Sequence, residues 1–107
     1  MAMAGDGPVG PIIFGYETAR QQLLEEGEVV TFRASRRTTG ETWWRETRTG
    51  PKQGDVIVEE IEGAVTPTTN VLADYADRSG FATAGAWQRA VDGVHGDPDH
   101  GWLYRVV

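Results

Sequence analysis

Residues 27–55, GEVVTFRASRRTTGETWWRETRTGPKQGD, form the stretch that we expect to decide the fold. Apolar and polar residues alternate along residues 29–37, a pattern typical of a strand with two different faces. Residues 41–48 fit a second strand, and Thr39-Gly40 between the two segments is a plausible tight turn. The glycines and the proline of residues 50–55 indicate a loop. The stretch therefore predicts one long β-hairpin followed by a turn.

The predicted hairpin is basic although the protein is acidic. The chain has 107 residues and a formal net charge of −6, yet this stretch carries six of its ten lysines and arginines, and between Arg33 and Lys52 only Glu41 and Glu46 oppose them. A cationic ribbon suits contacts to phosphate groups. The plainer interpretation is a solvated hairpin whose arginines balance nearby acids, for example Arg33 opposite Glu46. The six basic residues are Arg33, Arg36, Arg37, Arg45, Arg48 and Lys52.

Two adjacent tryptophans, Trp43 and Trp44, lie in the second half of this hairpin. Neighbouring side chains on a strand point to opposite faces, so only one of the two belongs to the core unless both faces are covered. With Thr39-Gly40 as a two-residue turn, Trp43 lies opposite Arg36, and Trp44 lies opposite Ser35 among polar residues. This register predicts that Trp44 is the exposed aromatic, and a slip of one residue would exchange the two roles.

Composition limits the classes of protein that remain. The length suits one domain with a modest core, and the absence of cysteine excludes disulfides and thiolate chemistry. No apolar run approaches the roughly 18 residues of a membrane helix, and the first residues lack the pattern of a signal peptide. We expect a disordered tail over residues 1–10, one domain over residues 11–107, and a cytoplasmic monomer that does not associate with membranes.

The basic residues are almost all arginine. An acidic chain with a single lysine resembles the proteins of salt-loving microbes, archaeal ones among them. At about 1 M salt the Debye length is roughly 3 Å, so long-range attraction to phosphates is mostly screened. Recognition of a nucleic acid under those conditions would depend on stacking and on short-range arginine hydrogen bonds.

The remaining sequence alternates short strands with helices. Residues 17–26 are amphipathic, with Ala19, Leu23 and Leu24 on one face and Gly27 as a left-handed cap. Thr83 is a cap for a helix running to about Val94, whose apolar stripe is Trp87, Ala90, Val91 and Val94. We expect an α+β fold: a small, mostly antiparallel barrel with two or three short helices at its side. Further strands are predicted at residues 12–14, 56–61 with a bulge at Glu62-Gly63, and 102–107, with a helical turn at 72–77.

Several of these features together resemble the ASCH domain family. The resemblance rests on the VVTFR strand after Gly27, the Pro-Lys-x-Gly-Asp turn over residues 51–55, the triplet Ser79-Gly80-Phe81 and the tryptophan-bearing helix that follows. It covers residues 11–107 and implies a PUA-like barrel that binds RNA or a nucleotide-containing ligand. No cofactor and no catalytic residue is predicted. The RNA-binding residues predicted on this basis are Thr31, Arg33, Arg36, Arg37, Trp44, Arg45, Arg48 and Lys52.

Some ASCH proteins are amidohydrolases that act on acetylated cytidine, with a Gly-x-Lys-x-x-Thr-x-Arg motif. Thr31 and Arg33 match the threonine and the arginine of that motif. The position of the lysine falls on Glu28 or on Val29, depending on the direction of counting, so the amine is missing. The hydrolase is therefore the alternative interpretation. A third hypothesis is a protein-interaction module that uses the hairpin as an exposed edge.

Residues 95–100 contain two histidines and two aspartates. Such side chains bind zinc and other divalent ions, but the short, proline-containing segment matches no known ligand spacing. We therefore predict no metal site. Elsewhere in the chain, Phe81, Trp87 and Trp102 are expected in the core.

Overall fold

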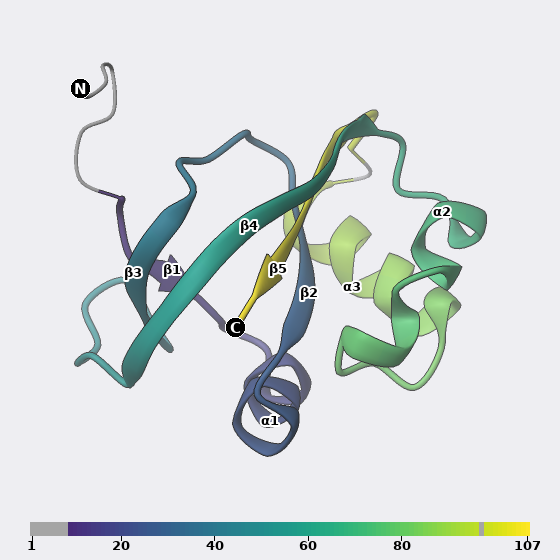
Figure 1. Cartoon of the computed structure of the whole chain (residues 1–107). Coiled ribbons are helices and arrows are strands. Elements are labelled where there is room, and N and C mark those ends of the chain that lie inside the picture. The colour runs from purple at the N-terminus through teal and green to yellow at the C-terminus, as the bar shows by residue number, and fades with distance from the viewer. Residues whose placement is uncertain (1–8, 97) are drawn as a thin grey trace.

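The computed structural model describes residues 9–96 and 98–107 of the chain (Figure 1). It is an α+β structure with one five-stranded sheet in the order β1-β3-β4-β5-β2. All neighbouring strands are antiparallel except β1 and β3, so the prediction of a mostly antiparallel sheet is confirmed. The elements are β1 (Ile12–Ile13), α1 (Glu17–Glu26), β2 (Val29–Arg33), β3 (Gly40–Arg45), β4 (Gly54–Val65), α2 (Thr69–Ala73), the 3₁₀-helix η1 (Ala76–Arg78), α3 (Ala84–His95) and β5 (Gly101–Val106).

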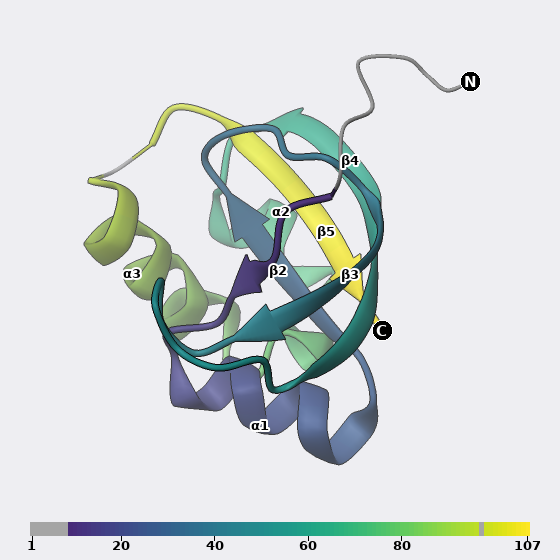
Figure 2. The ribbon, with the colours of Figure 1, turned by 90° about the vertical axis from the view of Figure 1, so that its left-hand side faces the viewer.

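The sheet curls into a half-barrel rather than the closed barrel that was predicted (Figure 2). Strand β4 is twelve residues long, and its pairing with β5 is irregular between Glu60 and Glu62 and between Gly63 and Val65. Such bulges bend a strand and increase its twist, and the break at Glu62-Gly63 was predicted. The edge strands β1 and β2 do not pair with each other. Instead, Arg33 on β2 donates a hydrogen bond from Nη2 to the carbonyl oxygen of Ile13, 2.9 Å away, and bridges the gap.

The predicted long hairpin is wrong. Strand β2 pairs with β5, with Thr31 opposite Tyr104, whereas β3 pairs with β4 on one side and β1 on the other. The physical reason lies in β5, whose residues Leu103 and Tyr104 are fully buried on opposite faces. A strand that is apolar on both faces belongs in the middle of a sheet, so β5 separates β2 from β4. Residues 34–39 are a connection between strands and not one arm of a hairpin.

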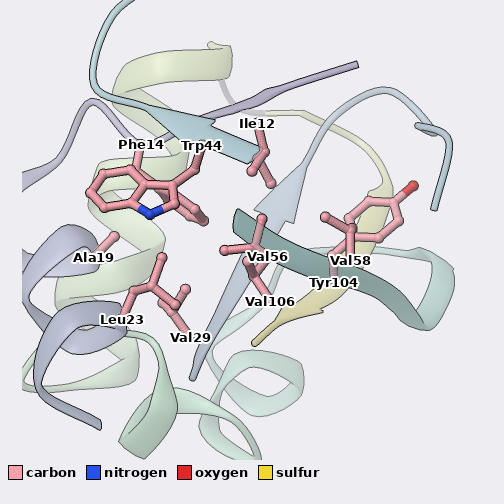
Figure 3. Close-up of a cluster of buried hydrophobic side chains, with 10 residues drawn as sticks. All are labelled: Ile12, Phe14, Ala19, Leu23, Val29, Trp44, Val56, Val58, Tyr104 and Val106. Carbon is pink, nitrogen blue, oxygen red and sulfur yellow. The ribbon is translucent and has the colours of Figure 1, made fainter. Parts of the chain in front are cut away.

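Trp44 points into the concave side of the half-barrel, where it is only 4% exposed (Figure 3). Its ring meets the ring of Phe14 edge to face at a centroid distance of 6.1 Å. The prediction that Trp44 is the exposed aromatic is therefore wrong, because the register that it assumed belongs to a hairpin that does not form. The buried residues of this inner core are Ile12, Phe14, Ala19, Leu23, Val29, Trp44, Val56, Val58, Tyr104 and Val106.

A second core lies on the other face of the sheet, beneath α2 and α3. Trp87 and Val91 of α3 are buried there as predicted, and they join Val30 and Phe32 of β2. Trp102 and Phe81 are only partly buried. The remaining buried members of this outer core are Leu72 and Leu103.

The boundaries of α1 and α3 follow the local sequence signals closely, whereas the helical turn predicted at residues 72–77 is replaced by α2 and η1. Gly27 has φ 74° and its N–H donates to the carbonyl of Leu23, as expected of a left-handed cap. Thr83 accepts a hydrogen bond from Ala86 N–H at 3.0 Å and caps α3. However, Leu24 and Val94 are 64% and 58% exposed, so the predicted apolar faces were too wide. Each helix touches the core over a narrower stripe.

The start of the described chain is held against β3. The hydroxyl of Thr42 lies 3.0 Å from the carbonyl oxygen of Val9 and 3.1 Å from that of Gly10. Residues 1–8 of the predicted tail lie outside the described residues. Within the described part of the chain, no helix combines the length and the apolar character needed to cross a membrane.

Candidate ligand-binding pocket

A pocket of about 490 Å³ lies where the half-barrel is open, between β2, the segment after β1, and α3. Its volume is within the range of small-molecule sites, and its walls are mainly apolar and aromatic. The apolar lining residues include members of both cores, together with residues of β1, of α3 and of the segment between η1 and α3. They are Ile13, Phe14, Ala19, Val30, Phe32, Phe81, Trp87, Ala90, Val91 and Val94; the polar or aromatic-polar ones are Tyr16, Thr31, Arg33, Arg48, Ser79 and His95.

Arg33 is the central charged residue of this pocket. Its guanidinium carbon lies 5.3 Å from the centre of the Phe14 ring, a distance suited to a cation–π contact. Its Nε is buried and has no hydrogen-bond partner. Burial, and secondarily the positive charge of Arg37, lowers the pKa of Arg33 from 12.5 to about 10, so the group stays charged at neutral pH.

The positive charge of the pocket is not neutralised by the protein. Among the described residues, no carboxylate lies within salt-bridge distance of Arg33 or Arg48. No Asp or Glu is among the lining residues, although the chain contains 16 acids. An uncompensated buried cation is costly, which makes an anionic or oxygen-rich ligand the natural counterpart of this pocket.

His95, at the end of α3, contributes a neutral polar group. Its ring meets the ring of Phe32 edge to face, with centroids 5.9 Å apart. Burial, and next the charge of Arg33, lowers the pKa of His95 below 6.5, so the neutral imidazole predominates at pH 7. A neutral imidazole offers one hydrogen-bond donor and one acceptor.

Tyr16 and Phe81 are pocket residues that the sequence did not reveal as such. Their rings meet at a centroid distance of 5.6 Å and an angle of 67°. Tyr16 is 43% exposed, and its hydroxyl donates to the carbonyl of Ala90 across 3.4 Å. Tyr16 precedes α1 and Phe81 precedes α3, so their meeting depends on packing that no local pattern encodes. The pair offers an aromatic surface at the pocket.

The structure brings together three of the eight predicted RNA-binding residues: Thr31, Arg33 and Arg48 line the pocket. Trp44 is in the inner core instead. Arg36 and Lys52 are paired with acids: Arg36 Nε lies 3.1 Å from Glu60, and Lys52 Nζ lies 2.6 Å from Asp55.

The other two predicted residues have structural partners. Arg37 donates from Nη2 to the carbonyl of Gly10 at 2.6 Å, and burial lowers its pKa. The guanidinium carbon of Arg45 lies 5.2 Å from the ring centre of Trp43. Trp43 is the more exposed of the two adjacent tryptophans.

The histidine segment after α3 does not form a ligand cluster in the part of the chain that is described. No group of three or more His, Asp or Glu side chains is placed there to hold a metal ion. His100 meets Trp102 edge to face, with centroids 5.7 Å apart. Asp97, one of the four residues of the sequence pattern, lies outside the described residues.

Comparisons with protein-family models, curated proteins and solved structures found no match to this chain. Its function is therefore argued from the pocket itself and from the resemblance noted in the sequence.

Proposed function

We propose that the chain is an ASCH-type, PUA-like module that binds RNA or a nucleotide-containing ligand in the pocket between β2 and α3. The observation that carries this proposal is the pair of uncompensated arginines, Arg33 and Arg48, in an aromatic-walled pocket free of carboxylates. The curled sheet with helices at its side is consistent with a PUA-like fold. The cytoplasmic location, the monomeric state and the adaptation to salt stay predictions.

A nucleotide supplies the groups that the pocket lacks. Its phosphate is an anion that Arg48, which is exposed at the pocket, contacts in this proposal. Its base is flat, and Tyr16 and Phe81 offer ring surface on which it stacks. Base–aromatic stacking contributes about 1–3 kcal/mol per base and depends less on salt than ion pairing does. The stacking role that the sequence assigned to Trp44 thus passes to these two residues.

Binding is favoured over the amidohydrolase alternative. Thr31 and Arg33, the two residues that match the hydrolase motif, do line the same pocket. No lysine is among the lining residues, and the single lysine of the chain, Lys52, is paired with Asp55. The protein-interaction alternative invoked the edge of a hairpin, but that hairpin does not form, and β3 pairs with β4 on one side and with β1 at Trp44 and Arg45 on the other.

Replacing Arg48 with glutamine is expected to weaken binding of single-stranded RNA about two- to fivefold at low salt, because an exposed phosphate contact is lost. The slope of log affinity against log salt should fall by about one. The matched control is Arg36→Gln, since Arg36 is also exposed but pairs with Glu60 and does not line the pocket. Filter binding over a salt series measures both effects. Equal losses in the two variants would contradict the placement of the site.

A further inference from the structure

Some backbone acceptors of the pocket are partly occupied. Four carbonyl groups of lining residues each accept a hydrogen bond from a side chain of the protein, which leaves one lone pair on each oxygen for a ligand. Arg33 donates to Ile13 and Tyr16 to Ala90, while Nη1 of Arg20 donates to Phe14 at 3.1 Å and to Gly15 at 3.0 Å.

The side chains of the pocket supply mostly donors. No Asp, Glu, Asn or Gln is among the lining residues. Ser79 is committed, since its hydroxyl donates to Ala76 at 2.7 Å and accepts from the N–H of Phe81 at 3.0 Å. Thr31 and the neutral His95 can each donate or accept. The guanidinium groups of Arg33 and Arg48 can only donate, and the buried Nε of Arg33 has no partner.

We infer that the pocket selects nucleotides with keto bases, uracil and guanine, over nucleotides with amino bases, adenine and cytosine. This inference rests on the proposed function and specifies its ligand. Guanine presents the acceptors O6 and N7, and uracil presents O4, whereas adenine and cytosine present exocyclic amino donors at the corresponding positions. If an amino group of the base faced Arg33, the N–H of the amino group and the N–H of the guanidinium would both be desolvated without an acceptor, which weakens binding.

The test is a calorimetric titration of the whole chain with UMP, GMP, AMP and CMP at one pH and salt concentration. The four ligands carry the same ribose phosphate, so differences in affinity report on the base. We expect UMP and GMP to bind at least about tenfold more tightly than AMP and CMP, in line with the cost of one wrong base edge. Equal binding of all four, or tighter binding of the amino bases, would overturn the inference while leaving the proposed function intact. If neither the four nucleotides nor RNA bound to the chain, the proposed function itself would be contradicted.

A second variant assigns the selectivity to Arg33. Arg33→Gln replaces a group that can only donate with an amide that can both donate and accept. The ratio of UMP to CMP affinity should fall toward one in this variant, provided that its circular dichroism spectrum matches that of the parent chain. In Arg48→Gln, by contrast, the affinity for all four nucleotides should fall by a similar factor, and the ratio should stay unchanged. An unchanged ratio in a folded Arg33→Gln protein would overturn the role of Arg33.

Discussion

Trp44→Ala is expected to destabilise the protein by about 3–5 kcal/mol, as truncation of a buried aromatic side chain does. Trp44 is 4% exposed and packs against Phe14 in the inner core. A domain of this size has a total stability on the order of 5–15 kcal/mol, so the variant should be close to unfolding under mild conditions. Urea denaturation followed by far-UV circular dichroism measures the change in the free energy of unfolding.

Trp43→Ala is the matched control, because it removes the same side chain one residue away. Trp43 is partly exposed, and its main described partner is the guanidinium of Arg45. Loss of this contact should cost about 1 kcal/mol. A larger loss of stability in Trp43→Ala than in Trp44→Ala would show that the faces of β3 are reversed.

Gly80→Ala is the second substitution with a large expected effect. Gly80 has φ 89°, a conformation that costs an L-residue about 1–2 kcal/mol. A Cβ at this position would also lie 2.3 Å from the carbonyl oxygen of Thr18 in α1, and overpacking of this kind costs about 1–3 kcal/mol. We expect a total loss of about 2–5 kcal/mol, measured as a shift of the urea midpoint.

The control for Gly80 is Gly27→Ala. Gly27 has φ 74°, but a Cβ there would meet no atom within 4 Å, so only the backbone cost applies. The difference between the two variants isolates the contact of residues 79–81 with α1. That contact also places Phe81 against Tyr16, so the RNA affinity of Gly80→Ala should fall more than that of Gly27→Ala. Equal stabilities would mean that the chain near Gly80 does not pack on Thr18.

Local signals predicted local structure well in this chain. The Gly27 and Thr83 caps, the length of α1 and the bulge in β4 all depend on residues close in sequence. The partner of β2 could not be found in this way, because β5 is some 70 residues further along the chain. The apolar pattern of β2 shows that it is a buried strand but does not specify which strand lies beside it.

The same limit applies to the pocket. Thr31 and Arg33 were identified from the sequence because they match two residues of the family motif, and they lie on one strand. Arg48 was identified only as part of a basic stretch, and the strand arrangement separates it from Arg36 and Lys52. Whether an arginine is neutralised depends on acids that are distant in sequence, such as Glu60. Composition alone therefore does not distinguish the residues at the pocket from the solvated ones.

The central claim is that the pocket between β2 and α3 is the ligand site, and mapping backbone amide shifts during a titration with single-stranded RNA tests it most directly. We expect saturable shifts confined to the residues around the pocket, which are residues 13–16, 30–33, 48, 79–81 and 90–95. Shifts confined to the separate surface around Trp43 and Ile57, or no shifts with saturating mixed-sequence RNA, would contradict this claim.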